Sequence, residues 1–246
     1  MRYLILSDLH SNWEGLDAVL ESTRGQYDRI VCCGDLVGYG PDPNRVLDWA
    51  RSNLEAVIRG NHDRGCCGQE SLEWFNPVAK AANIWTIGQL TPENMKYLRG
   101  LPAGPLPVDG FQLIHGSPLD EDEYLLNATD ARNVFDYLEC GLSFFGHTHL
   151  QCGYGYAEGY FQVMPQLDPF LGEICHRLDP EGIYLINAGS VGQPRDGDPR
   201  AAFALFDSET LELVQRRVVY DCETTRKKIE AAGLPEILGS RLTIGR

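Results

Sequence analysis

Short apolar segments that end in Asp, His or Asn recur along the sequence, and this pattern constrains the fold more than any other feature. The first three, Arg2–Leu6, Arg29–Cys33 and Leu54–Ile58, alternate with helix-forming stretches. Such strand–helix alternation is typical of a parallel sheet that is buried under helices. Ligands bind beyond the carboxyl ends of the strands in such sheets. The pattern therefore predicts that the polar strand ends converge; these are Asp8/His10, Asp35, Asn61/His62, His115, His147/His149 and Asn187.

Helix-start signals divide the first half of the chain. Ser11 stands three residues before Glu14, which is the capping-box spacing. A capping residue followed by proline at the first helical position recurs at Asp42-Pro43, Asn76-Pro77 and Thr91-Pro92. Residues 66–100 are therefore predicted to be helical, either as part of a lid or as a connection. The glycine of Arg59-Gly60-Asn61-His62-Asp63 is expected to permit a sharp turn after a strand.

The second half is predicted to be richer in strands, with hairpins at the Asp109-Gly110 and Glu158-Gly159 turns. A helix is expected from Thr129 to Cys140, and Asp221 is expected to cap a last helix before a short tail that begins at Leu234-Pro235. Further strands are expected at 142–145 and 183–186 and in a hairpin of 201–206 with 211–219. Without an internal repeat or linker, residues 1–246 are predicted to form a single domain.

Composition argues against several classes of partner. The net charge is −14, with 35 acidic and 21 basic residues, so nucleic acids and anionic membranes are disfavoured. The densest basic run, Arg226-Lys227-Lys228, is predicted to be a solvated helix face. The sequence has neither an apolar run long enough to span a bilayer nor an N-terminal secretory signal, and we expect a cytoplasmic protein. A homo-oligomer is left open.

The eight cysteines include no Cys-x-x-Cys pair, which argues against a structural zinc site. Cys32 and Cys33 lie in an apolar strand and are predicted to be core residues. Cys66 and Cys67 follow the Asn61-His62-Asp63 turn; redox-active thiols near a site are one interpretation, and reduced structural thiols are the favoured one.

Five of the six histidines fall at the polar strand ends, and His176 alone is expected in a surface or loop role. One such histidine is explained by a local hydrogen bond, but five interleaved with Asp and Asn favour a metal centre. Residues i and i+2 of an extended segment point to one side, so Asp8 with His10, and His147 with His149, are expected to act as pairs. Oxygen and imidazole ligands without thiolate suit Mn²⁺, Fe, Zn²⁺ or Mg²⁺, and Asp35 is placed to bridge two ions, roughly 3.5–4 Å apart in such centres.

As a set, these motifs resemble the calcineurin-like metallophosphoesterase family, and the compact, hairpin-rich chain is similar to its small bacterial and archaeal phosphodiesterase branch. The matching motifs are Asp8-x-His10, Gly34-Asp35, Gly60-Asn61-His62-Asp63, His115 and Gly146-His147-x-His149. The resemblance implies an α/β fold, a four-layer sandwich of two mixed β-sheets flanked by helices. It implies two divalent ions, Mn²⁺ by preference, with Fe, Zn²⁺, Ni²⁺ or Mg²⁺ as alternatives. One would be held by Asp8, His10, Asp35 and His149, and the other by Asp35, Asn61, His115 and His147.

The resemblance also implies that Asn61 and His62 face the substrate phosphate, with His62 as general acid or phosphate stabiliser. Asp63 either orients His62 in catalysis or makes a turn-stabilising contact. Arg195 either clamps a phosphate oxygen or pairs with nearby aspartates, and Arg59 is a lesser candidate for the clamp. The run Gly34-Asp35-Leu36-Val37-Gly38 lacks the Asp-Arg of protein phosphatases, which weakens that assignment.

The predicted function is phosphodiester hydrolysis by a hydroxide that bridges the two metals. The alternative is a nucleotide or dinucleoside polyphosphate hydrolase of the same family. A non-catalytic scaffold is disfavoured because every ligand position is filled. The expected partner is a small phosphoester or nucleotide, with no nucleic acid and no membrane.

Overall fold

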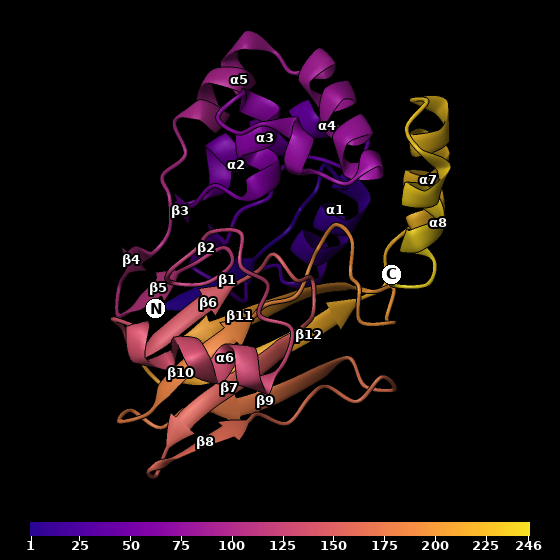
Figure 1. The fold of residues 1–246 in the computed structure, drawn as a ribbon. Helices are drawn as coiled ribbons and strands as arrows, with labels where there is room; N and C mark the ends of the chain where they lie inside the picture. Colours follow the sequence, from indigo (N-terminus) through magenta and orange to yellow (C-terminus); the bar gives the residue numbers. More distant parts are fainter.

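Two mixed six-stranded sheets lie face to face in the computed structural model, which describes residues 1–246 (Figure 1). The first sheet has the order β3-β2-β1-β11-β12-β9 and the second β4-β5-β6-β10-β7-β8. Neighbours are parallel within β1–β2–β3 and within β5–β6–β10, and antiparallel elsewhere. The strands of the first sheet are β1 (Arg2–Leu6), β2 (Arg29–Cys32), β3 (Ala56–Val57), β9 (Glu173–Arg177), β11 (Ala201–Asp207) and β12 (Glu212–Val218). Those of the second are β4 (Leu106–Val108), β5 (Phe111–Leu113), β6 (Leu142–Phe145), β7 (Cys152–Ala157), β8 (Tyr160–Val163) and β10 (Ile183–Asn187).

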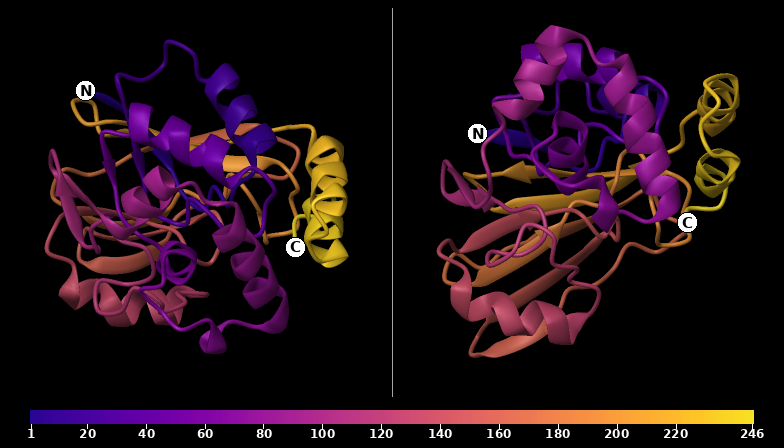
Figure 2. Two further views of the ribbon diagram at one scale, coloured as in Figure 1. Left: turned by 90° about the horizontal axis from the view of Figure 1, so that it is seen from above. Right: turned by 45° about the horizontal axis from the view of Figure 1, so that its top comes forward.

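Helices cover the outer faces of both sheets, which confirms the predicted four layers (Figure 1). Above the first sheet lie α1 (Trp13–Ser22), α2 (Pro43–Asn53), α3 (Asn61–Cys67), α4 (Pro77–Gln89) and α5 (Pro92–Arg99). A 3₁₀ turn, η1 (Leu72–Trp74), precedes α4. The second sheet is covered by α6 (Ala128–Val134), which continues into the 3₁₀ turn η2 (Phe135–Tyr137). At the side stand α7 (Cys222–Ala231) and α8 (Glu236–Leu242), as Figure 2 also shows.

Alternating side chains on the central strands explain the layers. On β1, Leu4 and Leu6 join the core under α1 and α2, whereas Tyr3 and Ile5 join the core between the sheets. On β6, Phe144 faces the other sheet and Phe145 packs towards α6. Because both faces of each central strand are buried, these strands read as continuous apolar runs, and each fully buried Leu, Ile or Phe contributes about 1.5–3 kcal/mol.

Local signals located most of the helices correctly, with corrections at α1 and at α2, where Asp42 is the N-cap residue but its side chain caps no amide. Asn76 and Thr91 cap α4 and α5 as predicted, since Asn76 Oδ1 accepts from the amides of residues 78 and 79 and Thr91 Oγ1 accepts from Asn94 N–H. The predicted capping box at Ser11 is wrong: Asn12 caps α1, and its Oδ1 accepts the Gly15 N–H at 3.1 Å. Ser11 has φ 53°, because the chain turns there to reach the polar strand ends.

The structure corrects the sequence prediction at three places in the second half: a helix end, a missed strand and a missed helix. The helix predicted to run to Cys140 ends at Val134, before η2. The edge strand β9 was not predicted, because its side chains alternate between exposed and half-buried and include few apolar residues. His176 therefore lies in a strand, opposite Leu213, rather than in a loop. Helix α8 replaces the predicted tail, and its buried Leu238 and Leu242 pack against residues of α4 and α7.

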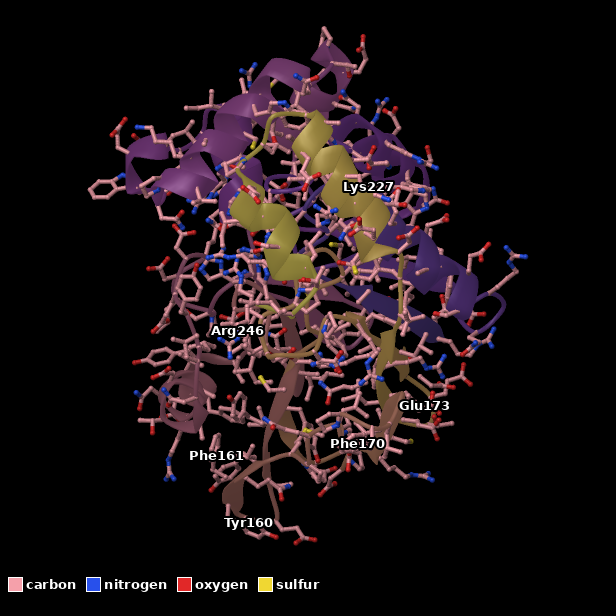
Figure 3. The ribbon with its side chains drawn as sticks, turned by 90° about the vertical axis from the view of Figure 1, so that its right-hand side faces the viewer. Tyr160, Phe161, Phe170, Glu173, Lys227 and Arg246 are labelled. Carbon is pink, nitrogen blue, oxygen red and sulfur yellow. The ribbon has the colours of Figure 1, made fainter.

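Helix α7, near the C-terminus, forms ion pairs with residues of the first half of the chain. As predicted, Asp221 caps it, accepting from Thr224 N–H at 3.0 Å. Lys227 lies on the outer face of the helix (Figure 3). Lys228 Nζ, however, contacts Glu14 Oε1 at 2.5 Å and Asp42 Oδ2 at 2.7 Å, so the basic run is only partly a solvated face. None of the helices has the length and apolar character needed to cross a bilayer.

Candidate metal centre

Asp and His side chains from four of the predicted polar strand ends meet in two buried clusters that share Asp35. Asn187 belongs to neither cluster, and its Nδ2 instead donates to Gly146 O and Thr148 Oγ1. In the first cluster, ligand atoms of Asp8, His10, Asp35 and His149 lie within 4.8 Å of one another, and in the second those of Asp35, His115 and His147 do. These residues follow β1, β2, β5 and β6, whose carboxyl ends point to one edge. Asp8 and His149 are the most widely separated of them in the sequence, and they come together in the first cluster only through the packing of the two sheets.

The backbone at this edge is left-handed at five of the clustered residues. Their φ angles are 51° at Asp8, 44° at His10, 55° at Asp35, 64° at His147 and 60° at His149. Residues other than glycine rarely adopt this backbone region, because it costs about 1–3 kcal/mol for each residue. Strain of this kind is found most often at functional sites. The chain is therefore not extended here, which overturns the expectation that His147 and His149 point to one side: they belong to different clusters.

Backbone carbonyls fix the imidazoles of three clustered histidines. In each of these rings Nδ1–H donates to a backbone carbonyl: His10 to Val37 O (2.9 Å), His115 to Cys33 O (2.8 Å) and His149 to Gln193 O (2.6 Å). In His10 and His149 the unprotonated Nε2 is then left for a cation, the usual arrangement of metal-binding histidines. At His115 burial alone would lower the pKa, but the Asp35 carboxylate outweighs burial and raises the pKa to about 9, so a cation bound there would displace the Nε2 proton. His147 is reversed, because its Nε2 lies 3.1 Å from Asp122 O and leaves Nδ1 free.

The donor atoms of the first cluster fit a cation. The Nε2 atoms of His10 and His149 approach to 3.0 Å, and they lie 3.5 Å from Asp35 Oδ2 and 3.4 Å from Asp8 Oδ1 respectively. Burial lowers the pKa of both imidazoles, so two lone pairs face each other beside two carboxylates. Asp8 Oδ2 is buried without a hydrogen-bond partner, and burial raises the pKa of Asp8 to about 7. A divalent ion would offset the repulsion between the lone pairs and the cost of burying the carboxylates. Carboxylate oxygen and imidazole nitrogen donors suit a hard or borderline metal ion.

Helix α3 adds Asn61 and His62 at the second cluster. Asn61, the first helical residue, places Oδ1 at 3.4 Å from His115 Nε2. The next backbone amide, His62 N–H, donates to Asp35 Oδ1 at 2.9 Å. Gly60 does not provide the predicted sharp turn, because its φ of −104° suits any residue. It is needed for space, since a Cβ there would lie 2.1 Å from Asp35 Oδ1.

Asn83 of α4, not Asp63, contacts the His62 ring. His62 Nδ1 donates to Asn83 Oδ1 at 2.8 Å, whereas Asp63 accepts from the backbone N–H of Gly60 (3.0 Å) and of Val37 (3.2 Å). The interpretation of Asp63 as a local, backbone-binding residue is thus the one that agrees with its hydrogen bonds. Asn83 was missed because it lies 21 residues beyond His62 and follows no motif.

The sequence model of the calcineurin-like phosphoesterase superfamily domain matches residues 1–211, which include every residue of both clusters. The chain belongs to this superfamily. It is 38% identical to a metallophosphoesterase from Sphaerobacter thermophilus whose crystal structure is known; the match covers 100% of this chain and 99% of that one, with a TM-score of 0.85. It is also 37% identical over 248 residues to an uncharacterized protein of Methanocaldococcus jannaschii, covering 98% and 97% of the two chains. A hypothetical protein from Pyrococcus horikoshii, 20% identical over 100% of this chain and 98% of its own, shares the fold with a TM-score of 0.79.

Arg195 is the cation of this metallophosphoesterase that lies beside the clusters without a carboxylate partner. Its Nη2 donates to Gln193 Oε1 at 3.0 Å, and its Cζ lies 5.5 Å from the centre of the Tyr39 ring. The predicted pairing with nearby aspartates is not formed, because Asp196 binds Arg217 and Asp198 binds Arg200. Arg59, the lesser candidate, is held by Glu121 through two hydrogen bonds of 2.7 and 2.8 Å.

The cysteines of the metallophosphoesterase are all free thiols. Cys66 and Cys67 lie on the buried side of α3 in the same core as Cys32. Burial raises the pKa of both thiols, which disfavours the reactive thiolate. Their positions therefore agree with structural thiols, the interpretation that the sequence favoured.

Proposed function

We propose that this metallophosphoesterase hydrolyses phosphodiesters at a dinuclear metal centre. Asp8, His10, Asp35 and His149 would hold one ion, and Asp35, Asn61, His115 and His147 the other. The observation that carries the proposal is the shared Asp35 carboxylate, which belongs to both buried clusters. We expect Mn²⁺ as the ion, a choice that the oxygen and nitrogen donors permit along with Fe, Zn²⁺, Ni²⁺ and Mg²⁺.

When bound, two such ions lower the pKa of water and neutralise charge on the phosphoryl oxygens. The chain's own residues orient the ester. Nδ1–H of His62 donates to Asn83, so Nε2 is the ring nitrogen that can act on the leaving oxygen. Because burial lowers the pKa of this imidazole, the proton transfer requires the doubly protonated ring, which gives its Nε2 proton to the leaving oxygen and keeps Nδ1–H on Asn83. Arg195, with no carboxylate partner, is placed to donate to a phosphate oxygen.

The charge around the centre favours a diester over a monoester. A monoester at neutral pH carries about one more negative charge than a diester. The neighbouring pocket contains Glu70 and Asp122, which share the single cation Arg64. With Arg195 as the one unpaired cation beside the clusters, the site has little positive charge of its own with which to hold a second anionic oxygen.

Metal-dependent turnover of bis(p-nitrophenyl) phosphate is the test of the proposed function. After reloading with Mn²⁺, we expect hydrolysis that a chelator abolishes and Mn²⁺ restores, with slower turnover of p-nitrophenyl phosphate. Metal content measured on the same samples provides the control. A protein that holds no metal and hydrolyses neither ester would instead be a scaffold, and a faster monoester reaction would contradict the diesterase assignment.

Replacing Arg195 by alanine is expected to lower kcat/KM for the diester by about 10–100-fold, the usual value of a charge-assisted hydrogen bond. Metal content is expected to stay at two ions, because Arg195 belongs to neither cluster. Arg24→Ala, which removes the same charge from an exposed position, is the matched control. Equal kcat/KM for Arg195→Ala and Arg24→Ala would remove Arg195 from the substrate site.

A further inference from the structure

A pocket of about 200 Å³ opens beside the two clusters. Asn61, His62 and His147 form its inner side, so whatever fills it lies next to the reacting groups. Its outer side comes from η1, the start of α4 and the loop before α6. The remaining lining residues are Tyr39, Glu70, Trp74, Phe75, Asn76, Ala79, Asp122 and Tyr124.

Aromatic rings dominate the apolar part of this pocket. Of its five apolar lining residues, only Ala79 is aliphatic. Two of the rings surround His62, with ring centres at 4.3 Å for Tyr39 and 5.1 Å for Phe75, and Tyr124 lies 4.0 Å from His147. A pocket for an aliphatic group could be lined equally well by leucine or valine side chains. Aromatic rings in these positions favour a planar ligand, which can stack on them.

Trp74 supplies the exposed part of this wall. It is the last residue of η1, and its side chain is 82% exposed, although tryptophan is usually largely buried. An indole that lines a pocket and stays in water gains most of its stacking surface only when a ligand covers it. Tyr124, exposed to 48%, flanks the pocket in the same way.

The charges around the pocket indicate which end of the substrate binds there and which end binds at the clusters. Glu70 and Asp122 both contact Arg64 Nη2, so the acids are already paired. The pocket therefore offers no free cation to a phosphate, which belongs at the clusters and at Arg195. A neutral planar group is compatible with the pocket, and its place beside His62 puts it on the leaving-group side.

We propose that this pocket binds a planar aromatic group of the phosphoester substrate, as in a nucleoside phosphoester, by stacking on Trp74 and its neighbouring rings. The proposal rests on the proposed function, because it takes the phosphate to bind at the two clusters. It names the substrate class of that site: small aromatic phosphoesters, in preference to alkyl or sugar phosphates.

The test compares AMP with ribose 5-phosphate by calorimetry on the Mn²⁺-loaded protein. The two ligands carry the same phosphate and sugar and differ in the base alone. We expect AMP to bind about tenfold more tightly, which corresponds to the weaker end of base–aromatic stacking. Trp74→Ala is expected to abolish most of that advantage and leave ribose 5-phosphate binding unchanged, whereas Trp74→Phe is expected to retain it.

Phe170→Ala is the matched control, because Phe170 is 96% exposed and lies near β9 on the face in Figure 3. Equal affinities of AMP and ribose 5-phosphate for the wild-type protein would overturn the aromatic pocket and leave the phosphate site intact. An AMP advantage that survives in Trp74→Ala would also overturn it, by placing the base elsewhere. Failure of both phosphates to bind a two-metal protein that hydrolyses bis(p-nitrophenyl) phosphate would overturn the pocket alone, because both ligands are monoesters. Failure of both to bind a two-metal protein that does not hydrolyse the diester would overturn the proposed function, and the pocket with it.

Discussion

Asp35→Asn is expected to leave the protein folded but unable to hold two metal ions. Asp35 is the one carboxylate common to both clusters, with Oδ2 at 3.5 Å from Nε2 of His10 and of His115. An amide keeps the shape and the acceptor for the His62 N–H, but it lacks the negative charge that would bridge two cations. Losing the ions removes several kcal/mol of transition-state stabilisation, so diester turnover is expected to fall by on the order of 10³-fold.

Metal analysis and turnover on the same preparation check this prediction. Asp136→Asn provides the matched control, because it makes the same change at an exposed residue of η2. Melting curves without metal should show a folded Asp35→Asn protein. Added Mn²⁺ should raise the melting temperatures of the wild type and of Asp136→Asn more than that of Asp35→Asn, since a ligand stabilises only the state that binds it. Two bound ions and undiminished turnover in the variant would contradict a bridging role.

His62→Ala is expected to keep both metals and lower turnover by about 10²–10⁴-fold, the range for a general acid. The loss should be larger for a phenyl ester than for a p-nitrophenyl ester, because phenoxide is the more basic leaving group and needs the proton more. Metal binding should persist because the imidazole of His62 is in neither cluster, and its backbone N–H to Asp35 remains in alanine. Parallel kinetics on the two esters, with metal content, measure the effect.

Two further variants separate a proton donor from a structural residue. His176→Ala removes a histidine from β9 and is expected to leave both reactions unchanged. Asn83→Ala retains the imidazole of His62 but removes the acceptor for its Nδ1, so a smaller loss is expected, again greater for the phenyl ester. An equal loss on both esters in His62→Ala would assign His62 to phosphate stabilisation instead of leaving-group protonation.

The sequence predicted the parts of this molecule that depend on short-range pattern. The apolar runs of β1, β2, β6 and β10 were found because strands buried on both faces carry no polar positions to interrupt them. The caps at Asn76, Thr91 and Asp221 were found because capping depends on the next three residues. Elements with weak local signals were missed: β9 lies at an edge with few apolar side chains, and α8 follows a proline.

The sequence also predicted which residues cluster, because an Asp or His directly after a buried apolar strand is not explained by core packing. The family resemblance also divided them between two ion sites as the clusters divide them, whereas spacing alone did not, since it does not encode the left-handed φ angles that separate His147 from His149. The sequence left open whether Asp63 orients His62, and it did not identify Asn83, which reaches that ring only through the packing of α4.

Local chemistry determined which residues of this metallophosphoesterase carry donor atoms at the strand ends. Tertiary packing alone decided which of them are neighbours, which carbonyls hold the histidines, and why Arg195 is left unpaired while Arg59, Arg200 and Arg217 are not. The physical reason is that backbone carbonyls and long side chains carry no sequence signature of the distant atoms they meet. Those meetings form only when two sheets and their helices close over one edge.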